Sequence, residues 1–169
     1  QDSHLESVKD FQLHFALRDA IGEDPTWRTG ITRVHATLSQ DGVYPDPNRL
    51  VTFVDNHDTD RWRSVAGDVA RTRYGIGLVM MTRGIPCLYY GTELGMDGFA
   101  APDGLVRDDF PGGWHDDARN AFKESGRTLE ERELWQFTAA LGQARRTYRG
   151  AFASPMTHLI PRKGQYHFL

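Results

Sequence analysis

The hydrophobic positions of the chain form short apolar runs that are separated by amphipathic stretches. The run at residues 50–54, Leu-Val-Thr-Phe-Val, has almost no polar alternation, which predicts a strand buried on both faces of a parallel sheet. A second apolar run at 85–90 ends at Gly91 and predicts another strand. Between them, Asp68 is a candidate N-cap for a helix that continues through Arg83. The order strand, helix, strand requires parallel strands joined by a right-handed crossover.

A further strand and helix are expected before this unit. Apolar residues fall mostly at every second position over 5–17 and predict a first strand, and residues 16–21 are compatible with the start of a helix. Apolar residues at helical spacing predict a helix over about 27–39. Pro45 and Pro47 then favour an extended approach to the next strand. The pattern up to this point is β-α-β-α-β, an α/β fold.

The last third of the chain has a different pattern. Residues 95–125 are rich in Gly, Pro, Asp and aromatic side chains and show no periodicity. A loop of this length inside a compact domain is usually functional. Thr128 and Glu131 have the spacing of a capping box, and they predict the start of an amphipathic helix that ends at about Arg149.

A domain boundary is predicted near Gly150. Two short β-rich runs follow it, at 158–160 and 165–169, and predict a β-hairpin. We therefore assign residues 1–150 to one α/β unit and residues 151–169 to the beginning of a truncated C-terminal β-sandwich domain. Because the chain lacks an initial Met and enters a strand-like segment almost at once, we interpret it as a piece of a longer protein.

Composition narrows the possible partners. The 169 residues are 39% hydrophobic and 25% charged, as in ordinary globular domains, and 20 basic against 23 acidic side chains give a formal charge of -3. This balance argues against electrostatic binding to nucleic acid or to a membrane, and no run of about 18 apolar residues predicts a membrane span. The single cysteine, Cys87, excludes an internal disulfide and a multi-cysteine zinc site, and its apolar surroundings predict a packed core thiol.

A cluster of polar side chains directly follows the run at 50–54. Asp55, Asn56, His57 and Asp58 come first, and Asp60 with Arg61 then suggests an ion pair on the loop surface. In α/β folds, ligands bind at the carboxyl ends of strands. Two interpretations of Asp55 and Asn56 are open: they contact a ligand, or they only hydrogen-bond the loop and orient their neighbours.

Two segments carry a resemblance to a known family. Phe-Val-Asp-Asn-His-Asp at 53–58 resembles the motif at the end of the seventh barrel strand in the α-amylase family of glycoside hydrolases, and Gly-Ile-Pro-Cys-Leu-Tyr-Tyr-Gly-Thr-Glu at 84–93 resembles the eighth-strand motif. Residues 107–114 and 120–122 resemble the neopullulanase and cyclomaltodextrinase branch, whose members act on α-1,4-linked glucans. Residues 8–17 would match the sixth strand.

The resemblance implies a partial (β/α)8 TIM barrel, about strands 6 to 8, followed by the start of a C-terminal all-β domain. In this family the Asp at position 58 stabilises the transition state by holding ring hydroxyls and distorting the sugar, and His57 donates a hydrogen bond to the same sugar. The other substrate contacts implied or considered are Asn56, Tyr90, Arg107, Asp108 and Trp114.

Several of these assignments have structural alternatives. Tyr90 and Glu93 suit a role in supporting the eighth strand, although Tyr90 could stack against glucose. The aromatic residues of the long loop either anchor it or stack against sugar C–H groups; they are Phe99, Phe110 and Trp114. Arg107 and Asp108 could fix outer glucose units by hydrogen bonds.

The resemblance also indicates what the chain lacks. Retaining glycosidases pair a nucleophilic carboxylate with a protonated carboxylic acid, and in this family these groups follow the fourth and fifth strands. We therefore expect the isolated chain to be inactive and to fold poorly without the N-terminal part of the barrel. The expected partners are that missing part and an α-glucan oligosaccharide. No cofactor or metal site is predicted in this chain, and the sequence does not indicate whether a full-length protein binds calcium elsewhere. Neither oligomeric state nor location is indicated.

Two other functions are alternatives to a glycosidase. The Asp-Asn-His-Asp segment at 55–58 offers metal ligands somewhat like those of metallophosphoesterases, but the further Asp and His clusters that such enzymes need are not evident. A non-catalytic carbohydrate-binding remnant is the second alternative, and it is consistent with the two missing carboxylates.

Overall fold

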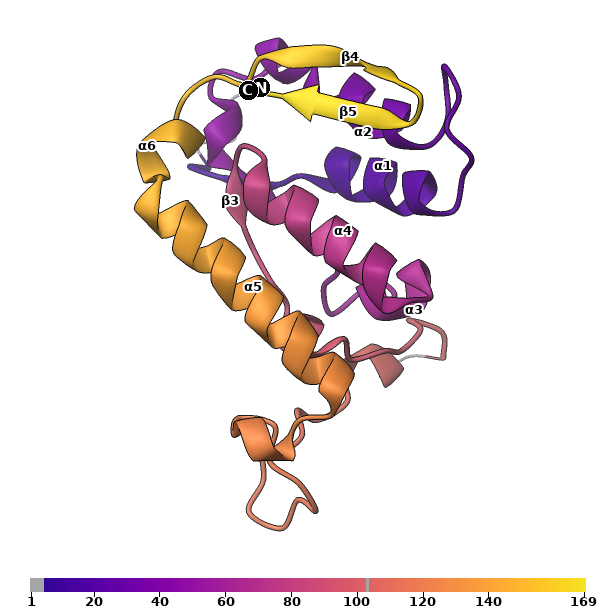
Figure 1. Cartoon of the computed structure of the whole chain (residues 1–169), viewed down its shortest axis with the longest axis vertical. Helices are drawn as coiled ribbons and strands as arrows, with labels where there is room; N and C mark the ends of the chain where they lie inside the picture. The colour runs from indigo at the N-terminus through magenta and orange to yellow at the C-terminus, as the bar shows by residue number, and fades with distance from the viewer. Residues whose placement is uncertain (1–4, 103) are drawn as a thin grey trace.

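The computed structural model describes residues 5–102 and 104–169. A three-stranded parallel sheet packs against a group of helices, and a hairpin forms a separate two-stranded sheet (Figure 1). The helices and strands are β1 (Val8–Lys9), α1 (Phe11–Ile21), α2 (Ile31–Leu38), β2 (Leu50–Thr52), α3 (Trp62–Ala66), α4 (Val69–Met81), β3 (Ile85–Pro86), α5 (Leu129–Thr147), α6 (Arg149–Phe152), β4 (His158–Arg162) and β5 (Gln165–Phe168). Single 3₁₀ turns occur at Asp41–Val43, Pro47–Arg49, Thr92–Leu94, Leu105–Arg107 and Glu124–Gly126.

The predicted parallel sheet is confirmed. Its strand order is β1-β2-β3, with Val8 opposite Leu50 and Val51 opposite Ile85. Strands β2 and β3 are shorter than the apolar runs that predicted them. The hairpin of β4 and β5 is antiparallel, as the two C-terminal runs predicted.

Helix capping agrees with the sequence at two places. The Asp68 carboxylate accepts a hydrogen bond from the Arg71 amide at 2.7 Å, and α4 begins directly after it. Thr128 and Glu131 form the predicted reciprocal capping box at the start of α5. The helix predicted over about 27–39 begins later, at Ile31, because Gly30 has a φ of 63° that does not continue a helix.

The first predicted strand, over 5–17, is wrong. Only Val8–Lys9 is extended, and α1 starts at Phe11 because the Asp10 carboxylate accepts a hydrogen bond from the Leu13 amide at 2.9 Å. Leu13, Leu17 and Ala20 lie on one buried helical face. The alternation at every second residue does not reflect a strand, since Phe11 and Phe15 stay partly exposed on α1.

The core lies between the sheet and the helices, and α3 packs closely on α4 at one glycine. A side chain added at Gly75 would place its Cβ 2.2 Å from Trp62, so only glycine allows the indole to pack against α4. The Trp62 indole N–H donates to the Thr72 carbonyl at 3.1 Å. The buried core side chains are Leu13, Leu17, Ala20, Ile31, Val34, Leu38, Val54, Trp62, Ala66, Ile76, Val79 and Met80.

Helix α5 fixes the turn from α4 into β3. One guanidinium nitrogen of Arg145 donates to the carbonyls of Met80 at 2.7 Å and of Thr82 at 2.8 Å, and the other donates to the Gly84 carbonyl. These carbonyls have no partner within α4 because they lie at or beyond its last turn. A side chain of α5 therefore supplies the missing hydrogen-bond donors for the end of α4, which lies more than sixty residues earlier in the chain.

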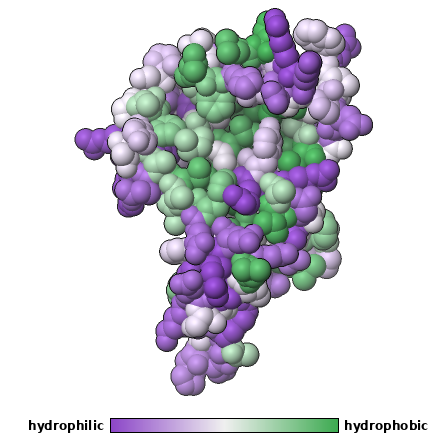
Figure 2. All heavy atoms as spheres, in the orientation of Figure 1, coloured by the Kyte–Doolittle hydropathy of each residue, from purple (hydrophilic) through white to green (hydrophobic). Residues whose placement is uncertain are grey.

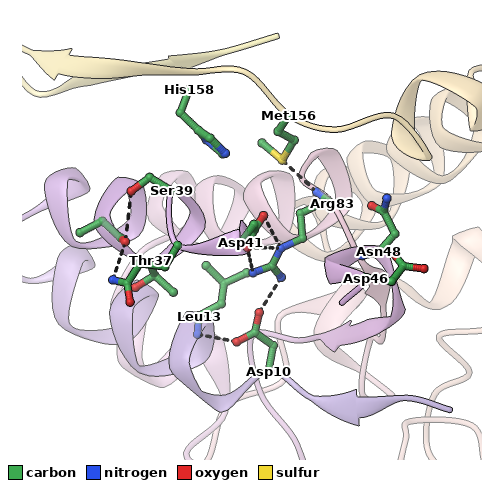
Figure 3. Close-up of polar contacts among 12 residues, drawn as sticks. Asp10, Leu13, Thr37, Ser39, Asp41, Asp46, Asn48, Arg83, Met156 and His158 are labelled. Carbon is green, nitrogen blue, oxygen red and sulfur yellow. Dashed lines mark hydrogen bonds and ion pairs between the residues drawn. The ribbon is translucent and has the colours of Figure 1, made fainter. Parts of the chain in front are cut away.

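A buried ion network joins the start of α1 to the same turn (Figure 3). Arg83 donates to the Asp10 carboxylate at 2.6 Å and to the Asp41 carboxylate at 2.6 Å. The side chains of Arg83 and Asp10 are 2% and 1% exposed, and that of Asp41 is 14% exposed. The Arg83 amide donates to the Met156 sulfur at 3.3 Å, which attaches the segment before β4 to this network.

One face of the parallel sheet is open in the described residues. Lys9 and Ile85 flank Val51 in register on this face, and Ile85 is 48% exposed. Cys87 continues the same edge strand and is exposed, so the prediction of a packed core thiol is wrong. The apolar run was identified correctly, but the helices cover only the other face of β3.

His14 is a buried titratable group in α1. It is 2% exposed, its ring stacks on Phe53 at 4.9 Å, and neither ring nitrogen has a hydrogen-bond partner within the described residues. Burial lowers the pKa of His14 because an apolar environment disfavours the imidazolium.

Replacing Arg83 should destabilise the fold strongly. Arg83→Met leaves Asp10 and Asp41 without their counter-charge, and breaking such a buried pair costs about 3–5 kcal/mol of unfolding free energy. Arg71→Met is the matched control, because its pair with Asp68 is 3.7 Å long and exposed, and such pairs contribute about 0–1 kcal/mol. Urea unfolding of a protein that joins this chain to its upstream segment measures both losses. Equal losses in the two variants would contradict a dominant role for the network.

Stability should fall as the pH drops below about 6.5, the ordinary pKa of histidine. The pKa of His14 is lowered in the folded state, so the unfolded chain binds the proton first and gains population as the pH falls. The slope for one proton is at most about 1.4 kcal/mol per pH unit. His14→Phe should reduce the dependence of the melting temperature on pH between pH 5 and pH 7. The substitution His115→Phe, at an exposed position, should leave this dependence unchanged. An unchanged slope in His14→Phe would refute this.

Candidate functional site

Asp55 anchors the loop that follows β2. It is 2% exposed, and its two oxygens accept hydrogen bonds from the Thr92 hydroxyl at 2.7 Å and from the Trp62 amide at 2.8 Å. Burial raises the pKa of Asp55, and these hydrogen bonds with the nearby Arg61 charge oppose that rise. The side chain therefore joins the end of β2 to the start of α3 and to the turn after β3, which is the structural one of the two interpretations considered for it.

Arg61 is the buried counter-charge of Asp55. It is fully buried, its Nε lies 3.4 Å from the Asp55 carboxylate, and its terminal nitrogens donate to the carbonyls of Tyr90 at 2.6 Å and Val106 at 3.2 Å. Its guanidinium also lies 4.6 Å from the centroid of the Tyr89 ring. Arg61 thus connects the loop after β2 to the loop after β3.

The predicted surface pair of Asp60 with Arg61 is wrong. Asp60 instead pairs with Arg18 of α1 at 2.8 Å, and its other oxygen accepts from the Ala100 amide at 2.8 Å. Residues that are adjacent in the sequence point in opposite directions in this extended segment, one into the core and the other toward α1.

Asn56 shapes the turn that presents the next two residues. It is 7% exposed, its side-chain oxygen accepts from the Asp58 amide at 2.8 Å, and its own amide donates to the Thr59 hydroxyl at 3.0 Å. The structure therefore places Asn56 beneath the loop, where its contacts orient Asp58.

His57, Asp58 and Arg107 form an exposed cluster at the carboxyl end of β2. The His57 Nε2 and one Asp58 oxygen are 3.1 Å apart, and the other oxygen lies 3.3 Å from an Arg107 guanidinium nitrogen. Arg107 also donates through Nε to the His57 carbonyl at 3.0 Å. The side chains of His57 and Asp58 are 52% and 65% exposed, so both are open to a ligand. The structure thus brings three of the predicted site residues together.

Tyr90 borders this cluster and supports the long loop. Its hydroxyl donates to the Asp108 carbonyl at 2.9 Å, and its ring centroid is 4.5 Å from that of Tyr89. The Tyr89 ring in turn lies 6.5 Å from His57, and burial raises the pKa of Tyr89 to about 12. Tyr90 therefore positions the backbone of Asp108 beside Arg107, and its ring is 39% exposed.

The segment of the long loop at residues 110–126 projects from the body of the molecule, at the lower end of Figure 1, and Trp114 belongs to this segment. The Trp114 amide donates to the Asp117 carboxylate at 3.1 Å, and its side chain is 63% exposed. Phe110 and Phe122 pack against each other nearby at 4.4 Å. Figure 2 shows that this projection is mostly hydrophilic, whereas apolar side chains gather over the upper part of that face. The structure thus groups Tyr90, Arg107 and Asp108 with Asp58 and places Trp114 in a separate arm.

Thr92 is a site residue that sequence reasoning did not identify. It lies inside the segment 84–93, where only Tyr90 and Glu93 were considered, and a threonine in such a run gives no distinguishing pattern. Glu93 is partly buried beside Asp55 and Arg61, and burial raises its pKa. Among the described residues, no group of three or more His, Cys, Asp or Glu side chains is arranged to hold a metal, and no helix is long and apolar enough to cross a membrane.

Comparison with known proteins places this geometry in a family. The family model described as the alpha-amylase catalytic domain matches residues 1–149. A cyclomaltodextrin glucanotransferase of Paenibacillus macerans is 38% identical over 97 residues, and one of Bacillus licheniformis is 31% identical over 97 residues. Each alignment covers 57% of this chain and 13% of the relative, so the chain spans a small part of these proteins.

Solved structures agree on the fold. The α-amylase of Geobacillus thermoleovorans, solved with acarbose, superposes with a TM-score of 0.74 at 21% identity, over 97% of this chain and 34% of that one. The cyclic α-maltosyl-(1→6)-maltose hydrolase of Arthrobacter globiformis, solved with that cyclic sugar, gives a TM-score of 0.75 at 18% identity, over 96% and 34%. The chain spans about a third of both.

Removing the Thr92 hydroxyl should weaken the loop that carries the site. Thr92→Val keeps the side-chain shape but leaves one oxygen of buried Asp55 without a donor, which costs about 1–3 kcal/mol of unfolding free energy. Thr147→Val is the control, because its hydroxyl is an exposed acceptor at 3.5 Å on α5. Denaturant unfolding of a protein that joins this chain to its upstream segment measures both variants. A Thr92→Val variant as stable as the control would show that this hydrogen bond is dispensable.

Proposed function

The chain belongs to the alpha-amylase family of glycoside hydrolases, and from this premise we propose that it supplies the carboxyl-terminal part of a (β/α)8 barrel that cleaves α-1,4-glucans. The observation that carries the proposal is the exposed carboxylate of Asp58, held by His57 and Arg107 at the carboxyl end of a parallel strand. In barrels of this kind, catalytic groups come from that end of the strands.

We assign β1, β2 and β3 to strands six, seven and eight of the barrel, and residues 151–169 to the beginning of a C-terminal β-domain. The parallel order β1-β2-β3 and the family match over 1–149 support the first assignment. The hairpin forms a sheet of its own, which supports the second.

Asp58 would act as the transition-state stabiliser. In retaining hydrolysis, a nucleophilic carboxylate attacks the anomeric carbon while an acid protonates the leaving oxygen, and the sugar passes through an oxocarbenium-like state. Hydrogen bonds to ring hydroxyls strengthen in that state, so a fixed acceptor such as Asp58 lowers the barrier. The contacts from His57 and Arg107 hold both carboxylate oxygens in place before the sugar arrives. A preorganised acceptor needs no reorientation during the reaction.

The remaining predicted residues would bind substrate around Asp58. His57 is close enough to donate to the same sugar, and Arg107 and Asp108 lie on the adjoining loop for outer glucose units. Tyr90 offers a partly exposed ring at the border of the site. Trp114 would have to reach the glucan from the projecting arm, so we assign it to a distal glucose unit. Asn56 contributes by orienting Asp58.

The substrate branch and the need for the rest of the barrel are also proposals. The loop sequences at 107–114 and 120–122 favour the neopullulanase and cyclomaltodextrinase branch, whereas the curated relatives named above are glucanotransferases. We infer hydrolysis of α-1,4 linkages, with the nucleophile and the acid supplied by strands outside this chain. The chain alone would then be inactive. A metallophosphoesterase role has no supporting geometry among the described residues, and a binding remnant differs from our proposal only in activity.

Activity of the completed barrel tests the proposal. In a protein that joins this chain to its upstream segment, Asp58→Asn should lower kcat on maltoheptaose by about a hundredfold or more, because the amide cannot accept as strongly from the ring hydroxyls. Asp116→Asn, at an exposed position of the long loop, should retain full activity. The 169-residue chain alone should release no reducing sugar. Full activity in Asp58→Asn, or activity of the chain alone, would overturn the proposal.

A further inference from the structure

The hairpin of β4 and β5 rests on α2 through three rings. The Nδ1 atom of His158 lies 2.5 Å from the Tyr166 hydroxyl oxygen, and the two rings are nearly parallel, at 14°. His35 of α2 meets both rings edge-on, with centroid distances of 5.3 Å to Tyr166 and 6.4 Å to His158. In Figure 1 the hairpin lies across α2. These three residues, which we call the hairpin contact, join the C-terminal segment to the α/β unit.

The hydrogen bond between His158 and Tyr166 depends on the protonation state of the imidazole. Burial raises the pKa of Tyr166 to about 12, so its hydroxyl keeps its proton at neutral and acidic pH. A neutral imidazole accepts a hydrogen bond at Nδ1 when its own proton is on Nε2, whereas an imidazolium carries N–H groups on both nitrogens and accepts none. Protonation of His158 therefore breaks or reverses this hydrogen bond.

The charges near His158 give an imidazolium little support. Figure 3 shows His158 pointing from β4 toward the body of the molecule, where Arg83 and Asp41 lie. The Asp41 carboxylate already accepts from the Arg83 guanidinium at 2.6 Å, so it offers His158 only part of a counter-charge. A protonated His35 would add a second positive charge across the hairpin contact, and like charges at this distance repel each other.

Docking of the hairpin and protonation of His158 oppose each other. Burial lowers the pKa of His158 in the docked hairpin; Asp41 opposes this shift, and His35 and Arg83 add to it. In a detached hairpin His158 would return to water, where the ordinary pKa of histidine is about 6.5. The detached state therefore binds the proton first as the pH falls. For one proton, each pH unit below 6.5 shifts the docking equilibrium toward detachment by at most about tenfold.

Water has room beside His158. A cavity of about 520 Å³ lies between residues 39–48 and the segment that leads into β4, and His158 is part of its lining. One water molecule needs only about 10–15 Å³ of such volume, so a proton can reach the imidazole while the hairpin is docked. The titratable and charged groups on the elements around His158 are His35, Asp41, Tyr44, Asp46, Arg83 and Tyr166.

We propose that the hairpin contact is a pH-sensitive switch, which holds the hairpin on α2 near neutral pH and releases it as the pH falls below about 6.5. The segment before β4 has attachments of its own: the Met156 sulfur accepts from the Arg83 amide at 3.3 Å, and the Ala153 carbonyl accepts from the Asn48 side chain at 3.2 Å. Release therefore swings the hairpin about this segment and leaves the core intact. The switch does not depend on the proposed function, since no residue of the Asp58 cluster takes part in it.

Electron–electron double resonance tests the proposal by measuring the distance between the hairpin and α2. Spin labels are attached at two exposed positions of the full-length protein through Ala36→Cys and Gln165→Cys, with Cys87→Ser and any other cysteine replaced. A second, longer distance should appear between pH 7 and pH 5, and its population relative to the short distance should rise by up to about tenfold per pH unit. Circular dichroism at each pH checks that the fold is retained. An unchanged distance distribution over this range would overturn the proposal.

Histidine variants of the labelled protein identify the group that titrates. His158→Asn keeps a hydrogen-bond acceptor near the position of Nδ1 but cannot be protonated, so its hairpin should stay docked at pH 5. His167→Asn is the matched control, because His167 is an exposed histidine of β5, and it should respond to acid as the wild type does. An acid response of His158→Asn equal to that of the wild type would refute the switch.

A third variant keeps the test decisive if the hairpin of His158→Asn is already detached at pH 7. His35→Asn removes one of the charges that oppose protonation of His158, so the pKa of His158 in the docked state should move toward its ordinary value. The acid response of His35→Asn should therefore be weaker than that of the wild type. An equal response in His35→Asn would overturn the proposal.

Discussion

The whole candidate site depends on the burial of one carboxylate beside one guanidinium. Asp55 and Arg61 are both removed from water, which is costly for each charge unless the remaining hydrogen-bonding positions are used. Several of them are used here: Asp55 accepts from the Thr92 hydroxyl and from an α3 amide, and the terminal nitrogens of Arg61 donate to two carbonyls in the segment after β3. The pair therefore ties three segments to one point. These buried contacts hold the segments beneath the loop on which His57 and Asp58 stand exposed.

Local sequence signals predicted the elements whose boundaries are set by local chemistry. Asp68 and the capping box of Thr128 with Glu131 predicted two helix starts correctly, because each cap involves residues only three positions apart. The segment 5–17 failed because its apolar residues fit both a strand and a helix, and the outcome was decided by Asp10, a cap that is also held by Arg83 from far along the chain. The prediction of a buried Cys87 failed for a similar reason, because an apolar run does not reveal which face of the resulting strand the helices cover.

Only the site residues that directly follow a predicted strand could be placed from the sequence. His57 and Asp58 follow a buried strand directly, so their placement at its carboxyl end could be inferred. The ion-pair partners of the charged loop residues could not be inferred. Arg61 pairs with Asp55 and Asp60 pairs with Arg18, and both pairs depend on how α1 and the loops pack. Arg107 was expected to contact sugar and is found on the Asp58 carboxylate, a contact that spans 49 positions. Thr92 was missed since a single hydroxyl has no sequence signature.

The contacts of Arg145 mean that one turn of the molecule can be completed only late in translation. This residue of α5 holds the carbonyls at the end of α4 and at Gly84, so the turn that leads into the edge strand is incomplete until α5 has left the ribosome. A nascent chain that stopped before α5 would present a helix end with unsatisfied carbonyls, and incompletely folded segments of this kind are prone to misassembly. The last long helix thus completes a part of the molecule that was translated some sixty codons earlier.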